Sequence, residues 1–137
     1  MKEIVFTPRL TAENIVPSAG DVIISIYTPN GSPAVLQQGW ADVLLLSFHD
    51  SDVSDVDVEL FSDHHAKQIF EFVEKHKDVE RLVVHCDMGH SRSAAIAIYL
   101  SEKHACACFK INRRVDWQSW PNYNKHIYRT LMLFDGC

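Results

Sequence analysis

The sequence has 137 residues, of which 47% are hydrophobic and 23% charged, and its formal net charge is −5. This composition is typical of a globular domain with one core, and it excludes an intrinsically disordered chain. The acidic balance argues against general affinity for nucleic acid or anionic membranes, and no apolar stretch is long enough to span a bilayer. We therefore predict a single domain over residues 1–137.

Short apolar runs separated by turn residues fill the first part of the sequence. Residues 4–6 predict a strand at a sheet edge, and residues 12–18 are compatible with a helical turn. Residues 21–27 are rich in β-branched side chains and predict a second strand, and residues 28–33, with their Pro and Gly, predict a turn after it. Residues 43–48 are almost continuously apolar, which predicts a third strand that is covered on both faces.

The middle of the sequence has the pattern of a strand–helix–strand crossover. The acidic residues 49–59 predict an exposed loop, and Ser62 is a plausible N-cap for the amphipathic helix that follows. Residues 81–85 predict a fourth strand, which a right-handed crossover places parallel to the third. The helix predicted over residues 91–104 is apolar around most of its circumference, so we expect it to be buried.

The last third of the sequence is less regular. Residues 106–111 are compatible with a short strand or an extended connector, residues 112–120 look irregular, and a last helix is predicted to begin at Pro121 or Asn122. Together the elements predict an α/β domain with a mostly parallel sheet of four to five strands and helices on both of its faces.

The run Val-Val-His-Cys-Asp-Met-Gly-His-Ser-Arg-Ser, from Val83 to Ser93, joins the fourth predicted strand to the buried helix. A tight loop at a helix N-terminus directs several backbone N–H groups toward one point, where the helix dipole adds positive potential. A thiolate at that point, such as that of Cys86, is stabilised. The guanidinium of Arg92 is suited to bidentate contact with a phosphate, and Gly89 lets the backbone close around an anion.

His85-Cys86-x5-Arg92-Ser93 with Gly89 at its centre resembles the signature of the cysteine-dependent protein tyrosine phosphatase superfamily. Its Gly-His-Ser-Arg-Ser ending resembles the dual-specificity branch, as in small bacterial and phage phosphatase-like proteins. The resemblance implies a phosphatase-type P-loop in which Cys86 attacks phosphorus to give a phosphocysteine, and Arg92 binds phosphoryl oxygens. It implies that His85 orients the loop and that Ser93 donates a hydrogen bond to the sulfur. The substrate-binding residues would be Asp87, Met88, Gly89, His90, Ser91 and Arg92.

This family also uses an Asp on a separate loop as the general acid, which later activates the hydrolytic water. Asp50 lies just past the third predicted strand and resembles the position of this acid in related small phosphatases. Counting back from Cys86 without gaps favours Asp55 instead, and Asp52 is a further candidate. We rank Asp50 first, followed by Asp55 and Asp52.

Other residues in the sequence favour no metal and no cofactor. His64, His65 and His49 lack a second cluster at ligand spacing and are interpreted as exposed histidines. Cys106 and Cys108 could resolve an oxidised Cys86, although alternation in a buried strand explains them more simply.

Two further features concern the surroundings of the loop. Asp87 places a negative charge that disfavours polyanionic inositol phosphates. Arg113, Arg114 and residues 117–123 could form a wall of the site.

The leading hypothesis is a metal-independent cysteine phosphatase acting on phosphotyrosine, and also on phosphoserine or phosphothreonine if the pocket is shallow. One alternative is a phosphoprotein-binding module with poor turnover. Another is a phosphatase of a small phosphate ester, a nucleotide or an RNA 5′ end. The expected partner is a phosphorylated protein or peptide, with neither nucleic acid nor membrane. The cysteines (Cys86, Cys106, Cys108 and Cys137) lack zinc-site spacing and the sequence begins without a cleavable signal pattern, so we expect a cytoplasmic protein.

Overall fold

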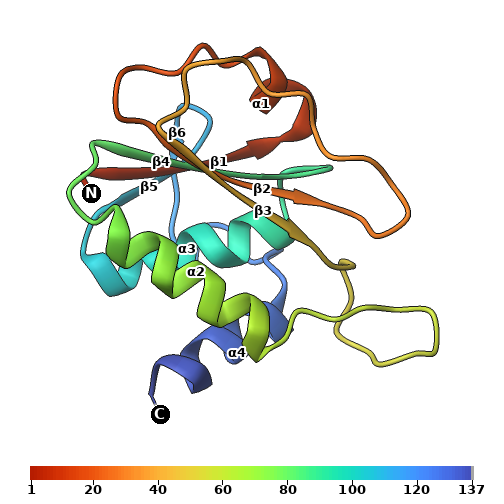
Figure 1. Ribbon diagram of the computed structural model, residues 1–137. Helices are drawn as coiled ribbons and strands as arrows, with labels where there is room; N and C mark the ends of the chain where they lie inside the picture. Colours follow the sequence, from red (N-terminus) through yellow and green to blue (C-terminus); the bar gives the residue numbers. More distant parts are fainter. Residues whose placement is uncertain (137) are drawn as a thin grey trace.

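A six-stranded sheet in the order β3-β2-β4-β1-β5-β6 forms the centre of the molecule (Figure 1). The computed structural model describes residues 1–136, so Cys137, the last residue of the predicted domain, lies outside the described residues. Neighbouring strands pair in parallel except β5 and β6, which are antiparallel. The strands are β1 (Glu3–Pro8), β2 (Val22–Tyr27), β3 (Asp42–Ser47), β4 (Arg81–Cys86), β5 (Ala107–Lys110) and β6 (Arg113–Arg114). The predicted α/β fold with a mostly parallel sheet is therefore confirmed, and β5 and β6 extend it to six strands.

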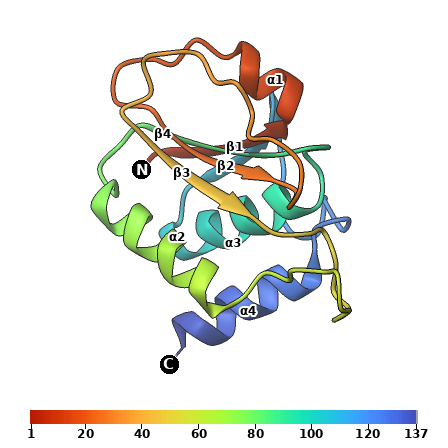
Figure 2. The ribbon, with the colours of Figure 1, turned by 45° about the vertical axis from the view of Figure 1, so that its right-hand side comes forward.

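The helices cover the two faces of this sheet unequally, as both ribbon views show (Figures 1 and 2). One face is covered by α2 (Asp63–Lys75) and α3 (Arg92–His104), on which α4 (Lys125–Asp135) packs, and the main apolar core lies there. Of the described helices, α1 (Arg9–Asn14) alone lies on the other face, where Ala12, Ile23 and Val83 form a small buried cluster. In the part of the chain that the structure describes, no helix combines the length and the apolar character required to cross a membrane.

The helix α3 lies deepest in the molecule, as its apolar sequence predicts. Every residue from Arg92 to Ser101 is buried. Small alanine side chains at several of these positions let the helix approach the sheet closely. The loop that precedes α3 is consequently attached to a rigid strand on one side and to a buried helix on the other.

Three details of the prediction are wrong. The strand β1 is not at an edge, because it pairs in parallel with both β4 and β5. The strand β3 is at an edge instead, and Val43 and Leu45 are 42% and 48% exposed, so only one of its faces is covered. The last helix begins at Lys125 rather than at Pro121 or Asn122, because the side chain of Asn124 caps it by accepting a hydrogen bond from the Ile127 N–H.

Parallel pairing brings the carboxyl ends of β1 to β5 to the same edge of the sheet. In the β1–β4 pair, Pro8 lies opposite Cys86, and in the β2–β3 pair, Tyr27 lies opposite Ser47. The residues that follow these strands therefore converge, and this edge is where ligands bind in open α/β folds.

Candidate active site

The loop over residues 87–91 connects β4 to α3 and is closely packed against β1. Gly89 has a φ of +70°, and a Cβ added to it would lie 2.1 Å from the backbone nitrogen of Pro8. Only glycine fits this position, because real Cβ atoms keep at least 3.0 Å from such neighbours and L-residues avoid this backbone region. The predicted role of Gly89 in closing the loop agrees with this geometry.

Cys86 ends β4 directly beneath this loop, and the residue is only 2% exposed. The backbone N–H of Gly89 donates a hydrogen bond to its Sγ at 3.3 Å, and the Sγ lies 3.2 Å from the Oγ of Ser93. A hydroxyl at this distance accepts from the thiol and can reverse to donate to a thiolate. The sulfur also lies close to the N-terminal end of α3, where the helix dipole favours negative charge.

Arg92, the first residue of α3, is 5% exposed, and its guanidinium is held by three acceptors. Its Nη1 donates to the Oγ1 of Thr28 at 3.0 Å and to the carbonyl oxygen of Phe48 at 2.9 Å. Its Nη2 donates to the Oδ2 of Asp87 at 3.0 Å. Among the described residues no acceptor contacts the buried Nε. An unpaired buried donor is costly, so an incoming anion would gain from satisfying it.

Asp87 is half-buried, and its carboxylate contacts Arg92. Burial alone would raise the pKa of its carboxyl group, but hydrogen bonds from Thr28, at 2.6 Å, and from Arg92 hold that pKa below its usual value. The carboxylate therefore stays ionised in mildly acidic solution. The predicted negative charge beside the loop is present and is paired with Arg92.

His85 is fully buried and lies behind the loop. Its Nδ1 is 3.3 Å from the carbonyl oxygen of Cys86, and its Nε2 is 2.6 Å from the Oγ of Ser25. Because a carbonyl only accepts, Nδ1 carries the proton and Nε2 accepts from Ser25. Burial lowers the pKa of His85, which favours this neutral form. These contacts support an orienting role and leave no free nitrogen for catalysis.

The three candidate acids differ in their contacts with the 87–91 loop. Asp50 accepts hydrogen bonds from the Oγ of Ser91 at 2.7 Å and from the Nδ2 of Asn124 at 2.9 Å, both through its Oδ1. Asp52 is exposed and lines the same cavity as Asp50 and Ser91, which has a volume of about 250 Å³. Asp55 is exposed and accepts from the N–H of its neighbour Val56. The geometry favours Asp50, although its role as the acid stays a prediction.

Two residues from the segment before α4 bind the outer side of the loop, and the sequence did not single out either for this role. The Nε1 of Trp120 donates to the carbonyl oxygen of His90 at 3.0 Å. The backbone N–H of Asn124 donates to the carbonyl oxygen of Ser91 at 3.1 Å. Trp120 falls within residues 117–123, which were expected to form a wall of the site. Met88, at 67% exposed, and His90 are at the open surface of the loop.

The other candidate residues lie outside this arrangement. His65 is buried rather than exposed, because it stacks on Phe61 and its Nδ1 accepts from the backbone N–H of Ser62, which caps α2. Within the described residues no group of three possible metal ligands occurs. Cys108 is buried in β5 beside the half-buried Cys106, and burial raises the pKa of the Cys108 thiol to about 12.

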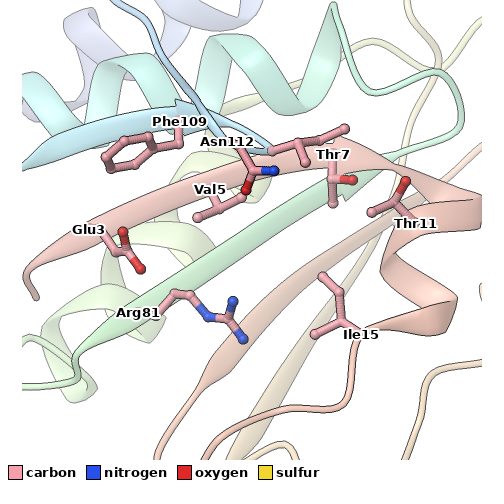
Figure 3. Close-up of a pocket in the computed structure, with 9 residues that line it drawn as sticks. Glu3, Val5, Thr7, Thr11, Ile15, Arg81, Phe109 and Asn112 are labelled. Atoms are coloured by element: carbon pink, nitrogen blue, oxygen red, sulfur yellow. The ribbon is translucent and has the colours of Figure 1, made fainter.

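A cavity of about 330 Å³ opens on the opposite face of the sheet, beside α1 (Figure 3). Side chains of β1, including Val5 and Thr7, form its floor, with Thr11 on one side and Arg81 on the other. Cys86, Arg92 and Asp50 do not line this cavity. Its lining includes the carboxylate of Glu3, and its guanidinium, that of Arg81, is already paired with Asp21. The candidate active site is therefore the 87–91 loop, where the thiol of Cys86 lies.

Comparison with known proteins supports the fold. No protein-family model matches the sequence, and no curated protein sequence matches it significantly. Among solved structures, the crystal structure of human tyrosine phosphatase-like serine/threonine/tyrosine-interacting protein matches with a TM-score of 0.52 and 19% identity. The match covers 84% of this chain and 76% of the human chain. At this identity the likeness shows a tyrosine-phosphatase-like fold, and it does not extend to activity.

Proposed function

We propose that this chain is a phosphomonoester hydrolase that uses Cys86 as its nucleophile and removes phosphate from phosphotyrosine in proteins. The observation that carries the proposal is a buried thiol before the loop and a buried guanidinium after it, whose Nε lacks an acceptor among the described residues. A phosphoryl group above Cys86 would supply that acceptor. The chain's own likeness to the dual-specificity signature, His85-Cys86-x5-Arg92-Ser93, supports the same chemistry.

The reaction would proceed in two displacements. In the first, the thiolate of Cys86, after its proton has left to solvent, forms a bond to phosphorus while the bond to the leaving oxygen breaks, and Asp50 donates the proton that this oxygen needs. Arg92 and the backbone N–H groups of the 87–91 loop bind the equatorial oxygens as charge develops on them. In the second, Asp50 takes a proton from water, the water oxygen attacks phosphorus, and the bond to sulfur breaks with Ser93 donating to the departing thiolate.

The open surface of the loop supports a substrate range that includes phosphoserine and phosphothreonine. Met88 and His90 are exposed. A deep cleft admits only the long phosphotyrosyl side chain, whereas a loop whose rim is at the surface is within reach of shorter ones. We place this activity in the cytoplasm, because a thiolate nucleophile must remain reduced.

Hydrolysis of an aryl phosphate between pH 5 and 8, in the presence of EDTA, tests this proposal. Wild type is compared with Cys86→Ser and with a matched thiol control, Cys106→Ser, and we expect activity to vanish only in the first variant. Asp50→Asn, Asp55→Asn and Asp52→Asn then identify the acid, since its loss lowers the rate by about a hundredfold or more. If the folded wild type captured phosphopeptides but did not hydrolyse them, the proposed enzymatic activity would be contradicted, and the phosphoprotein-binding module would remain as the function.

A further inference from the structure

The contacts of Arg92 use some of the N–H groups of its guanidinium and leave others without an acceptor. A guanidinium has five N–H groups in a rigid plane. Both hydrogens of Nη1 are used, by Thr28 and by the carbonyl oxygen of Phe48, and one hydrogen of Nη2 is used by Asp87. The hydrogens that remain are that of Nε and the second one of Nη2.

These two remaining hydrogens lie on one edge of the guanidinium. The Oγ1 of Thr28 accepts from Nη1 and donates to the same Oδ2 of Asp87 that accepts from Nη2. The Thr28 hydroxyl and the Asp87 carboxylate therefore occupy the edge between Nη1 and Nη2. The edge between Nε and Nη2 stays free, and two parallel N–H groups on one edge are what a phosphate binds in bidentate fashion.

We propose that Thr28 is a positioning residue which, together with Asp87, fixes the plane of Arg92 so that its Nε edge faces the phosphoryl group. This inference rests on the proposed function. Thr28 is suited to the role because it directly follows β2, whose last residue, Tyr27, pairs with Ser47 of β3. Its hydroxyl is therefore held by the sheet, and it acts as donor and acceptor at once. It touches the guanidinium and no reacting atom.

The same contacts also allow the opposite interpretation, in which they hinder anion binding, and an experiment distinguishes the two. If the Asp87 carboxylate competed with phosphate for Arg92, loosening the Thr28–Asp87 pair would free the guanidinium and strengthen anion binding. If the pair positions Arg92, loosening it lets the guanidinium rotate and weakens anion binding. Thr28→Val distinguishes the two, since it removes both hydrogen bonds of the hydroxyl without a change in charge or much change in size.

Binding of tungstate to the full chain, measured by calorimetry, tests the proposal without requiring turnover. The measurements use a Cys86→Ser background, in which the oxyanion binds without a covalent bond. We expect Thr28→Val to weaken tungstate binding by about tenfold to a hundredfold, and Thr28→Ser, which keeps the hydroxyl, to remain within about threefold of its parent. Thr11→Val is the matched control, because Thr11 lies in α1 beside the cavity of Figure 3.

Two further readouts separate positioning from a general structural effect. In the active chain, Thr28→Val should raise the KM for an aryl phosphate while the thermal midpoint stays close to that of Thr11→Val. Thr28→Val and Asp87→Asn, combined in a double-mutant cycle, should be non-additive, because both act through one guanidinium. If Thr28→Val does not fold, Thr28→Ala replaces it.

Unchanged or tighter tungstate binding by Thr28→Val would overturn the inference. Tungstate binding by wild type without any hydrolysis would instead contradict the proposed function and leave the role of Thr28 testable by binding alone.

Discussion

Gly89→Ala is the substitution whose effect follows most directly from the geometry of the loop. The added Cβ would lie 2.1 Å from the nitrogen of Pro8 and 2.4 Å from the carbonyl carbon of Thr7. Real Cβ atoms keep at least 3.0 Å, so the atoms must separate by 0.9 Å, the difference between 3.0 and 2.1 Å. Pro8 cannot move freely, because it is paired with Cys86 in the middle of the sheet. The loop must lift instead, which breaks the hydrogen bond from the Gly89 N–H to the Sγ of Cys86.

Two contributions set the size of the effect on stability. A left-handed φ in a residue with a Cβ raises the free energy of the folded state by about 1 to 2 kcal/mol, and forcing an extra carbon into a packed site adds about 1 to 3 kcal/mol. Gly89→Ala should therefore lower the free energy of unfolding by about 2 to 5 kcal/mol. Gly20→Ala separates the two contributions, since Gly20 has a φ of +88° and its added Cβ would have no neighbour within 4 Å. We expect about 1 to 2 kcal/mol for that variant.

Urea unfolding of wild type and the two variants at 25 °C measures both losses, and aryl phosphate hydrolysis under native conditions measures the effect on the site. We expect Gly89→Ala to lose about a hundredfold in rate, because a backbone donor of the loop is displaced, whereas Gly20→Ala should keep its activity. The packing argument would be refuted if Gly89→Ala were no less stable than Gly20→Ala.

Two further predictions concern the acid and the pH dependence of stability. Asn124→Ser keeps an oxygen to cap the Ile127 N–H but removes the amide that donates to Asp50, so hydrolysis of phenyl phosphate should fall by about tenfold while that of 4-nitrophenyl phosphate, whose leaving group needs no proton, changes little. Equal losses on both substrates would contradict the positioning of Asp50. A hydrogen bond from His76, at 2.8 Å, is the main cause that lowers the pKa of Asp42. A lowered carboxyl pKa stabilises the fold above the unfolded-state pKa, near 4, and that contribution is lost as pH falls through the lower folded-state pKa. In urea unfolding at pH 3 to 7, wild type should therefore be more stable than Asp42→Asn near neutral pH, and this difference in the free energy of unfolding should shrink as the pH falls. A difference that stays constant with pH would contradict the prediction.

The core of the candidate site could be predicted from the sequence because its determinants are local. Cys86, Gly89 and Arg92 lie within seven residues, and the strand before them and the helix after them have unambiguous patterns. Their arrangement follows because a tight loop joins the strand to the helix and has no room for a side chain at its centre. The parallel sheet was predictable for a similar reason, since a strand–helix–strand crossover of ordinary length allows one pairing direction.

The parts that the sequence did not predict depend on contacts between distant segments. Short apolar runs look alike whether they lie at the edge or in the middle of a sheet. For this reason β1 was predicted at an edge and β3 inside the sheet, the reverse of their positions in the structure. Thr28 and Arg92 are 64 positions apart, and Asn124 and Asp50 are 74 apart. One signal was available, because an Asn just before an amphipathic helix is a typical N-cap, and using it would have placed the start of α4 correctly.

The same distant contacts hold the loop of residues 87–91 in place. Gly89 rests on β1, Trp120 and Asn124 bind the carbonyl oxygens of His90 and Ser91, and Thr28 holds Arg92 through its outer edge. The folded chain has thus already oriented the groups that would otherwise have to reorganise around an anion, which is the condition under which fixed donors stabilise a developing charge most strongly. A substitution at Thr28, Trp120 or Asn124 should therefore reduce turnover more than it reduces stability, whereas Gly89→Ala should reduce both and substitutions in the core should mainly reduce stability.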